Sequence, residues 1–109
     1  MWLVVDANIL FSAVLRDGAT RRLLRQGALE LYAPEWIWDE IEANRAMLLS
    51  RSGTSRDALD LLTALLRETI QSVPSAVSDQ FLDQALARLD PGDAADAPYV
   101  ATALAIGGA

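Results

Sequence analysis

The hydrophobic positions of the chain form short, nearly unbroken runs separated by longer periodic stretches. The first run, 2–5, is apolar throughout and ends at Asp6, and a second run occupies 29–33. Runs without a polar face are typical of strands in a parallel sheet that is covered on both faces. We therefore predict strands at 2–6 and 29–33, and a third at 69–73, closed by Pro74.

Between these segments, apolar residues recur at helical spacing. This pattern predicts helices at 7–15, 21–26, 34–50, 54–68, 78–89 and 93–106. Local signals mark some of their ends: Pro34 as a first helical residue, Gly53 after a last turn, and Thr54 with Asp57 as a capping box. Strands that alternate with helices indicate an α/β fold with a parallel sheet and right-handed crossovers.

The composition removes several kinds of chemistry. With 109 residues the chain is expected to form a single domain, 1–109, and it contains no cysteine, histidine or lysine. Disulfides, Cys or His zinc sites, Ser-His-Asp triads and P-loop or Schiff-base lysines are therefore excluded. Carboxylates remain as the candidate catalytic groups. No apolar run is long enough to span a membrane, so we expect a cytoplasmic protein without membrane association.

The charge is distributed unevenly. A formal net charge of −6 weighs against simple electrostatic binding to nucleic acid, although bound divalent cations can invert the sign of an acidic site. A basic cluster nevertheless follows Asp6 in the sequence. Its members are Arg16, Arg21, Arg22 and Arg25, and they are candidates for contacting phosphates because arginine binds them bidentately.

Three positions carry acids that could form a site. Asp6 ends the first strand, where ligands gather in parallel α/β sheets, but it could equally cap the next helix. Glu40 falls on the flank of the apolar stripe of its predicted helix, on the side toward the sheet edge. Asp93 and Asp96 are three residues apart, which suits either a first helical turn or a metal site.

Carboxylates that converge in one cleft need a cation or a proton. Two like charges about 4 Å apart repel by about 4 kcal/mol at an intermediate dielectric constant. Oxygen ligands select Mg²⁺ or Mn²⁺ over zinc or copper, and such an ion would polarise a phosphoryl oxygen and lower the pKa of a bound water. Convergence of these acids would therefore indicate hydrolysis of phosphodiesters.

The chain resembles the PIN domain family of ribonucleases, including VapC-like toxins of toxin–antitoxin pairs. The resemblance rests on three segments in this order: VVDANILFSAVL, LYAPEWIWDEIEANRAMLL and DPGDAADAPYVATALAIGG. It covers nearly the whole chain. It implies a three-layer α/β/α fold with a central parallel sheet, strand one in the centre, and cleavage of single-stranded RNA that depends on Mg²⁺ or Mn²⁺.

The resemblance also assigns roles to residues. Carried over position by position, Asp6, Glu40 and Asp96 are the catalytic acids, and Asp6 and Asp96 bind metal. Asn8 is the polar group that orients Asp6. The expected partners are RNA, an antitoxin protein and a second copy of the chain in a homodimer.

Two departures from the family pattern affect these expectations. Ala95 stands where the family usually has an acid, so that Asp93 either replaces it as a metal ligand or only caps a helix. The family also continues into a W-[ST]-N-D strand, whereas this sequence ends at Ala109. We therefore expect the C-terminal strands to be missing and nuclease activity to be weak or absent.

Two other readings stay open. In the first, the chain is an inactive PIN-like binding or dimerisation module, with Trp36 and Trp38 on its interaction surface unless they pack locally. In the second, it is a receiver-like or phosphatase-like α/β domain. The lack of an Asp-x-Asp motif and of any lysine counts against that last reading.

Overall fold

Three parallel strands form the sheet of the molecule. The computed structural model describes residues 1–15, 22, 24, 27 and 29–107. Within them the strands are β1 (Trp2–Val4), β2 (Glu30–Pro34) and β3 (Ile70–Val73), in the order β1-β2-β3. Leu31 of β2 is in register with Leu3 on one side and with Ile70 on the other. The predicted parallel α/β fold is confirmed.

The first strand lies at an edge of this sheet. The family resemblance implies a central position for it, but within the described residues β1 pairs with β2 alone, because no other described segment forms a strand on its far side. The regular strand stops at Val4, although the Val5 N–H still donates to the Tyr32 carbonyl at 2.8 Å. The chain therefore leaves the sheet just before Asp6.

Pro34 ends a strand and does not begin a helix, so its assignment from the sequence was wrong. The Glu30 N–H donates toward β1 and the Glu35 N–H donates to Val73 of β3. Backbone N–H groups alternate in direction along a strand, so the backbone nitrogen of residue 34 faces the β1 side of β2, as that of Glu30 does. At this level β1 has already ended. A proline, which has no N–H, loses no ladder bond there.

The single helix predicted for 34–50 is two helices in the structure. They are α3 (Ile37–Ala43) and α4 (Arg45–Ser52), and Asn44 separates them with φ −103° and ψ 12°. The Asn44 side chain donates to the Glu40 carbonyl at 2.8 Å, which satisfies a backbone acceptor at the end of α3. The Asn44 backbone N–H donates to the same carbonyl at 3.1 Å, so the side-chain bond adds to the last helical bond of α3.

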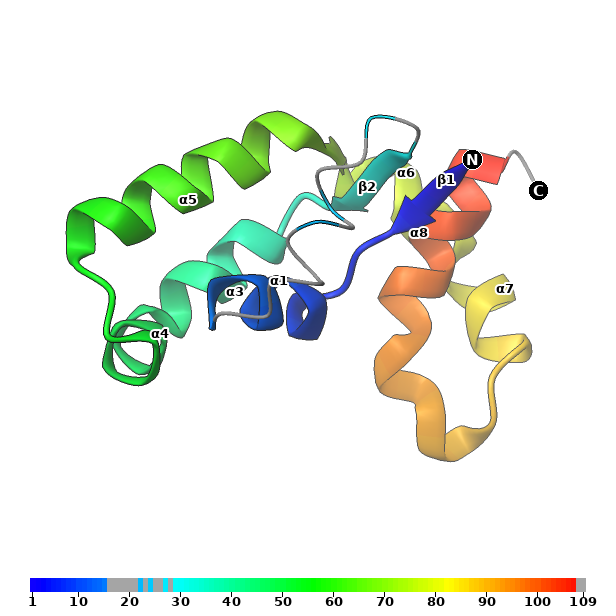
Figure 1. Cartoon of the computed structure of the whole chain (residues 1–109). Helices are drawn as coiled ribbons and strands as arrows, with labels where there is room; N and C mark the ends of the chain where they lie inside the picture. Colours follow the sequence, from blue (N-terminus) through cyan, green and yellow to red (C-terminus); the bar gives the residue numbers. More distant parts are fainter. Residues whose placement is uncertain (16–21, 23, 25–26, 28, 108–109) are drawn as a thin grey trace.

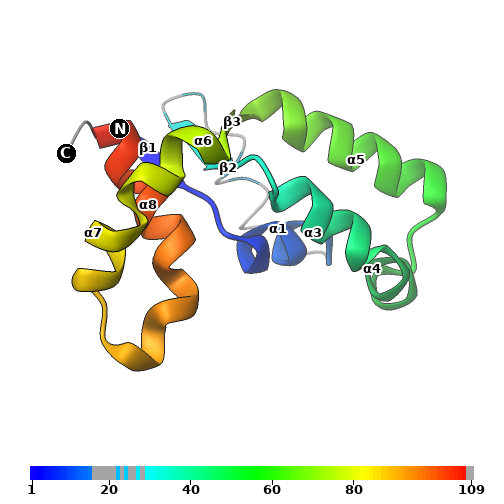
Figure 2. The same cartoon turned by 180° about the vertical axis from the view of Figure 1, so that it is seen from behind.

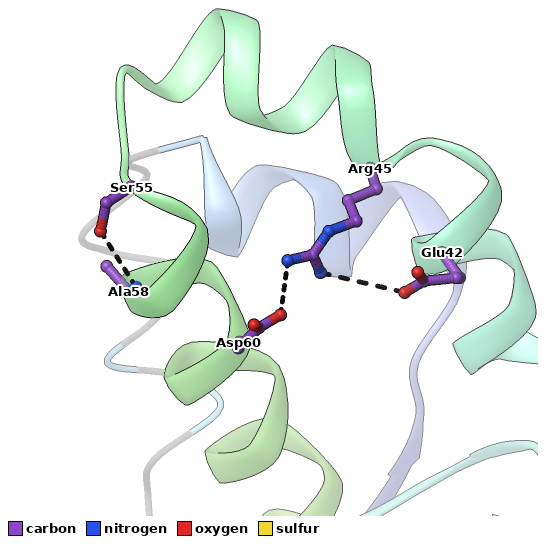
Figure 3. Close-up of polar contacts among 5 residues, drawn as sticks. All are labelled: Glu42, Arg45, Ser55, Ala58 and Asp60. Atoms are coloured by element: carbon purple, nitrogen blue, oxygen red, sulfur yellow. Dashed lines mark hydrogen bonds and ion pairs between the residues drawn. The ribbon is translucent and has the colours of Figure 1, made fainter.

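A polar corner joins α3 and α4 to α5 (Arg56–Thr69), as Figure 3 shows. Gly53 ends α4 with φ 65°. Ser55 caps α5, because its Oγ accepts a hydrogen bond from the Ala58 N–H at 3.1 Å; the prediction of Thr54 as the cap was wrong. The Arg45 guanidinium lies 2.6 Å from an Asp60 carboxylate oxygen and 3.9 Å from one of Glu42. Arg45 thus connects the three helices.

The C-terminal third consists of short pieces followed by one longer helix. They are α6 (Ser75–Ser78), the 3₁₀-helix η1 (Asp79–Phe81), α7 (Leu82–Ala87), the 3₁₀-helix η2 (Pro91–Asp96) and α8 (Ala97–Gly107). The helix predicted from 78 starts earlier, and the one predicted from 93 becomes α-helical only at Ala97. Asp93 and Asp96 accordingly lie in η2, before α8.

Helices cover the sheet from two sides, which completes the predicted α/β/α arrangement. Helices α1 (Ala7–Val14), α3, α4 and α5 lie on one side, and α6, α7 and α8 lie on the other (Figures 1 and 2). The larger core includes Val5, Leu10, Leu31 and Ile37, whereas the smaller consists of alanines and Leu104 between α7 and α8. Small side chains allow the backbones of these helices to lie close together. In the described part of the chain, no helix is long and apolar enough to cross a membrane.

Candidate functional site

Asp6 occupies the turn between β1 and α1, and it caps α1. Its backbone is extended, with φ −92° and ψ 170°, and its Oδ1 accepts a hydrogen bond from the Ile9 N–H at 2.9 Å. A carboxylate has a second oxygen, and no described residue donates to Oδ2 of Asp6. The cap and a role in a site are therefore compatible, because they use different oxygens.

Among the described residues no hydrogen bond joins Asn8 to Asp6, so the role of Asn8 stays a prediction. The predicted role was to orient Asp6, but the hydrogen bond that holds the Asp6 carboxylate comes from the Ile9 backbone. Asn8 itself is exposed in the first turn of α1.

Glu40 and Asp96 come from separate elements and are both exposed to solvent. Glu40 lies in the first turn of α3, and Asp96 is the last residue of η2, directly before α8. Asp93 is also exposed in η2, where its N–H donates to the Asp90 carbonyl at 2.8 Å. These acids are therefore free to approach a ligand from solvent.

Tyr99 connects these elements, and the sequence analysis assigned it no role. Its hydroxyl oxygen accepts a hydrogen bond from the Ala7 N–H at 3.3 Å, which joins the first turn of α8 to the N-terminus of α1 across 92 positions of sequence. Burial raises the pKa of the Tyr99 phenol above its ordinary value of 10.0, although the bond from Ala7 acts in the opposite direction. The negative charges of Asp6, Glu40 and Asp96 raise that pKa further.

The three predicted catalytic acids thus all raise the pKa of one phenol. Asp6 follows β1, Glu40 lies in α3 and Asp96 ends η2. Asp93 is not among the charges that act on Tyr99. A signal for Tyr99 was present in the sequence, because residues three apart on a helix face the same side and Tyr99 follows Asp96 by three.

The donor chemistry of this set fits Mg²⁺ or Mn²⁺. All three groups are carboxylates, the hard oxygen ligands that these ions prefer, and the chain has no cysteine or histidine for a softer metal. Among the described residues, however, no three such side chains form a group that could hold a metal ion.

The two tryptophans of the second segment have different environments. Trp38 is buried, at 8% exposure, its Nε1 donates to Ser72 Oγ at 3.0 Å, and the Arg67 guanidinium lies 5.3 Å from the centre of its ring. It therefore packs within the molecule and does not form an interaction surface. Trp36 is only partly buried, and its ring lies 5.5 Å from that of Tyr99, centre to centre.

The basic cluster lies mostly outside the described residues. This applies to Arg16, Arg21 and Arg25, whereas Arg22 is described and exposed. Their predicted contacts with phosphate therefore remain predictions.

Comparison with protein families gives a match that spans almost the whole chain. A family model described as a PIN domain matches residues 4–109, a range that includes the three acids and Tyr99. Comparison with curated proteins and with solved structures gives no match.

Proposed function

This chain belongs to the PIN domain family, and from that premise we propose that it is a divalent-metal-dependent endoribonuclease that cleaves single-stranded RNA. PIN domains are in general nucleases and typically depend on divalent metal ions. The observation that supports the proposal most directly is that Asp6, Glu40 and Asp96, from three separate elements, all act on the phenol of Tyr99.

In this proposal Asp6, Glu40 and Asp96 hold the metal, with Asp93 as a further ligand. Bound Mg²⁺ or Mn²⁺ would polarise a phosphoryl oxygen and lower the pKa of a bound water. The chain contributes the positions of the ligands. Asp6 is held in place by its bond to the Ile9 N–H, while Glu40 and Asp96 are exposed and can turn toward a cation.

Tyr99 contributes a hydrogen-bond donor to the same place. Its oxygen accepts a hydrogen bond from the Ala7 N–H, and a phenol, whose ordinary pKa is 10.0, is protonated at neutral pH. The hydroxyl hydrogen is therefore available to a carboxylate or to a phosphate oxygen.

Cleavage of labelled single-stranded RNA by the chain in Mn²⁺ buffer tests the proposal. We expect slow internal cleavage that stops on chelation, because the carboxylates must first move together around the ion. Asp96→Asn should lower the rate by at least about 100-fold, since it removes a charge that the reaction centre requires. Asp90→Asn, at an exposed aspartate before η2, is the control.

Calorimetric titration with Mn²⁺ tests metal binding separately from catalysis. We expect heat of binding in the wild-type chain and much less in Asp6→Asn and in Asp96→Asn. Equal heats in all three proteins would remove the support for a carboxylate metal site.

The arginine cluster is proposed to contact RNA phosphates beside this site. In Arg22→Ala, the slope of log binding constant against log salt should fall by roughly one unit for each lost phosphate contact. An unchanged slope would exclude Arg22 from the interface.

A binding or dimerisation module is the second candidate. It is favoured by the exposed apolar residues of α5, since Leu61 and Leu65 are 63% and 52% exposed. In that case the chain would bind Mn²⁺ or RNA without cleaving it. Light scattering would show a homodimer that Leu61→Glu dissociates.

The biological setting is proposed on the family resemblance alone. We propose that the chain acts in the cytoplasm as the toxin of a toxin–antitoxin pair. Expression in a bacterial host tests this: growth should stop with the wild-type chain and continue with Asp96→Asn.

A further inference from the structure

Trp36 and Tyr99 form an aromatic pair beside the candidate site. Trp36 is the residue before α3, four positions ahead of Glu40, and Tyr99 is in the first turn of α8, three positions after Asp96. The ring centres are 5.5 Å apart and the planes are tilted by 58°. Two of the three acidic elements thus each contribute one ring to the same pair.

The two aromatic side chains are not fully buried or hydrogen-bonded within the fold. Both rings are partly exposed, and no described residue accepts a hydrogen bond from the Trp36 indole N–H. Trp38, only two residues away, is buried, donates to Ser72 and lies against Arg67. Trp38 is therefore fixed by contacts within the molecule, whereas part of the Trp36 side chain remains accessible to a ligand.

At this acidic site, an attraction that does not depend on charge would add to the affinity for RNA. The chain has a net charge of −6, and the groups around Tyr99 are three carboxylates, which repel the phosphates of a nucleic acid. A cation would relieve this repulsion at the site itself. Stacking of a base on an aromatic ring adds affinity that does not depend on charge and that tolerates any base.

We propose that Trp36 and Tyr99 form a stacking platform for one unpaired base of an RNA strand whose neighbouring phosphate lies at Asp6, Glu40 and Asp96. The inference rests on the proposed nuclease function and adds the residues that select a single strand. A base in a duplex is already stacked and paired, so it cannot use the platform without being extruded. The bond from the Ala7 N–H to the Tyr99 hydroxyl holds that ring in place before RNA binds.

Fluorescence anisotropy with two labelled oligoribonucleotides tests the platform. One has all its bases, and the other has abasic positions at its centre and the same number of phosphates. Ca²⁺ replaces Mg²⁺ in the buffer to allow binding while slowing cleavage. The wild-type chain should bind the complete strand from about 5-fold to about 100-fold more tightly than the abasic one, the range that one stacked base contributes.

Substitutions then locate the effect. Trp36→Leu, which keeps an apolar side chain without a π face, should bring the ratio of the two affinities close to one. Trp36→Phe keeps a ring and should preserve the ratio. Trp2→Ala is the control, because Trp2 is also exposed but lies at the opposite end of β1 from Asp6. Circular dichroism of each variant confirms that it is folded.

The outcomes separate this inference from the function on which it rests. If the wild-type chain binds both strands equally, the platform is wrong while RNA binding stands. A ratio that persists in Trp36→Leu also overturns it. If neither strand binds at all, the proposed function fails and the platform fails with it.

Discussion

The carboxylate of Asp6 serves the fold and the candidate site at the same position. Its Oδ1 satisfies the Ile9 N–H at the start of α1, one of the donors that every helix leaves without an internal partner. The sequence alone left capping and metal binding as alternatives. The structure confirms the cap and leaves the other oxygen available, so the two readings do not compete.

Substitutions at Asp6 should separate these two roles. Asp6→Ala removes the cap and should lower the free energy of unfolding by about 1 kcal/mol, whereas Asp6→Asn keeps an oxygen acceptor and should cost much less. Both remove the charge, so both should lose Mn²⁺ binding. Urea denaturation in chelator provides the stabilities. Equal losses of stability in the two variants would show that the cap contributes little.

The phenol of Tyr99 should make stability sensitive to alkaline pH. Its pKa is raised in the folded chain, so the unfolded phenol releases its proton first, near pH 10, and further alkali favours unfolding. The stabilisation is complete below pH 10 and is lost as the pH rises through the folded pKa. The free energy of unfolding in chelator should therefore fall less steeply above pH 10 in Tyr99→Phe than in the wild type. A wild-type slope in Tyr99→Phe would contradict this expectation.

The contacts of Tyr99 were not predicted from the sequence, although the acids around it were named. The family resemblance named Asp6, Glu40 and Asp96 from local motifs, and all three raise the pKa of Tyr99. Their convergence on a metal ion stays a prediction. The bond from Ala7 to Tyr99 joins positions 92 residues apart, and no local pattern reports such a contact. It follows only from the packing of α8 beside β1 and the start of α1.

At the scale of elements, short side-chain bonds decided where helices begin and end. The apolar periodicity across 34–50 is continuous, and it does not distinguish one helix from two. Asn44 ends α3 with a side-chain bond to the Glu40 carbonyl. Pro34 was assigned to the wrong element because proline suits both a first helical turn and the end of a strand.

Two glycines offer a matched test of the end of α4. Gly53 has φ 65°, a left-handed conformation that costs a residue with a Cβ about 1 kcal/mol or more. A Cβ would meet no atom within 4 Å at Gly53 or at Gly92, and Gly92 has no positive φ. Gly53→Ala should therefore destabilise the chain by about 1 kcal/mol, whereas Gly92→Ala should be neutral or slightly stabilising. Thermal unfolding measures both, and a neutral Gly53→Ala would contradict the strain argument.

The ion pair between Arg45 and Asp60 should contribute little despite its short distance. Their side chains are 26% and 60% exposed, and pairs at such surfaces are typically worth about 0.2 to 1 kcal/mol. A double-mutant cycle with Arg45→Met and Asp60→Asn should give a coupling energy in that range, smaller at high salt. Coupling between Arg45 and Glu42, 3.9 Å apart, should be weaker still. Coupling well above 1 kcal/mol would show that this corner is effectively desolvated.

At the scale of the molecule, the layered fold was predictable because it depends on burial. Strands of a parallel α/β sheet are rich in apolar residues, and the runs ending near Asp6 and Pro34 predicted β1 and β2. The spacing between the carboxylates was not predictable, because it depends on small shifts of helices and on the charges that they carry. The described acids lie near one phenol without forming a ready group of ligands.

A bound cation should therefore stabilise the whole molecule. Mn²⁺ that binds only the folded chain adds about 2.7 kcal/mol at about 100 times its dissociation constant, which corresponds to an increase in Tm of several degrees. Wild type and Asp90→Asn should show this increase by calorimetry, and Asp96→Asn should not. An equal increase in all three would place the bound Mn²⁺ elsewhere on this acidic chain.

The cap at Asp6 also bears on how such a domain can lose its activity in evolution. Asparagine caps a helix about as well as aspartate, and the two residues differ by a single base change in their codons. One nucleotide substitution could therefore remove a charge from the acidic cluster and leave the start of α1 intact. A chain of this fold can in this way lose a charge at the candidate site in one step and stay folded.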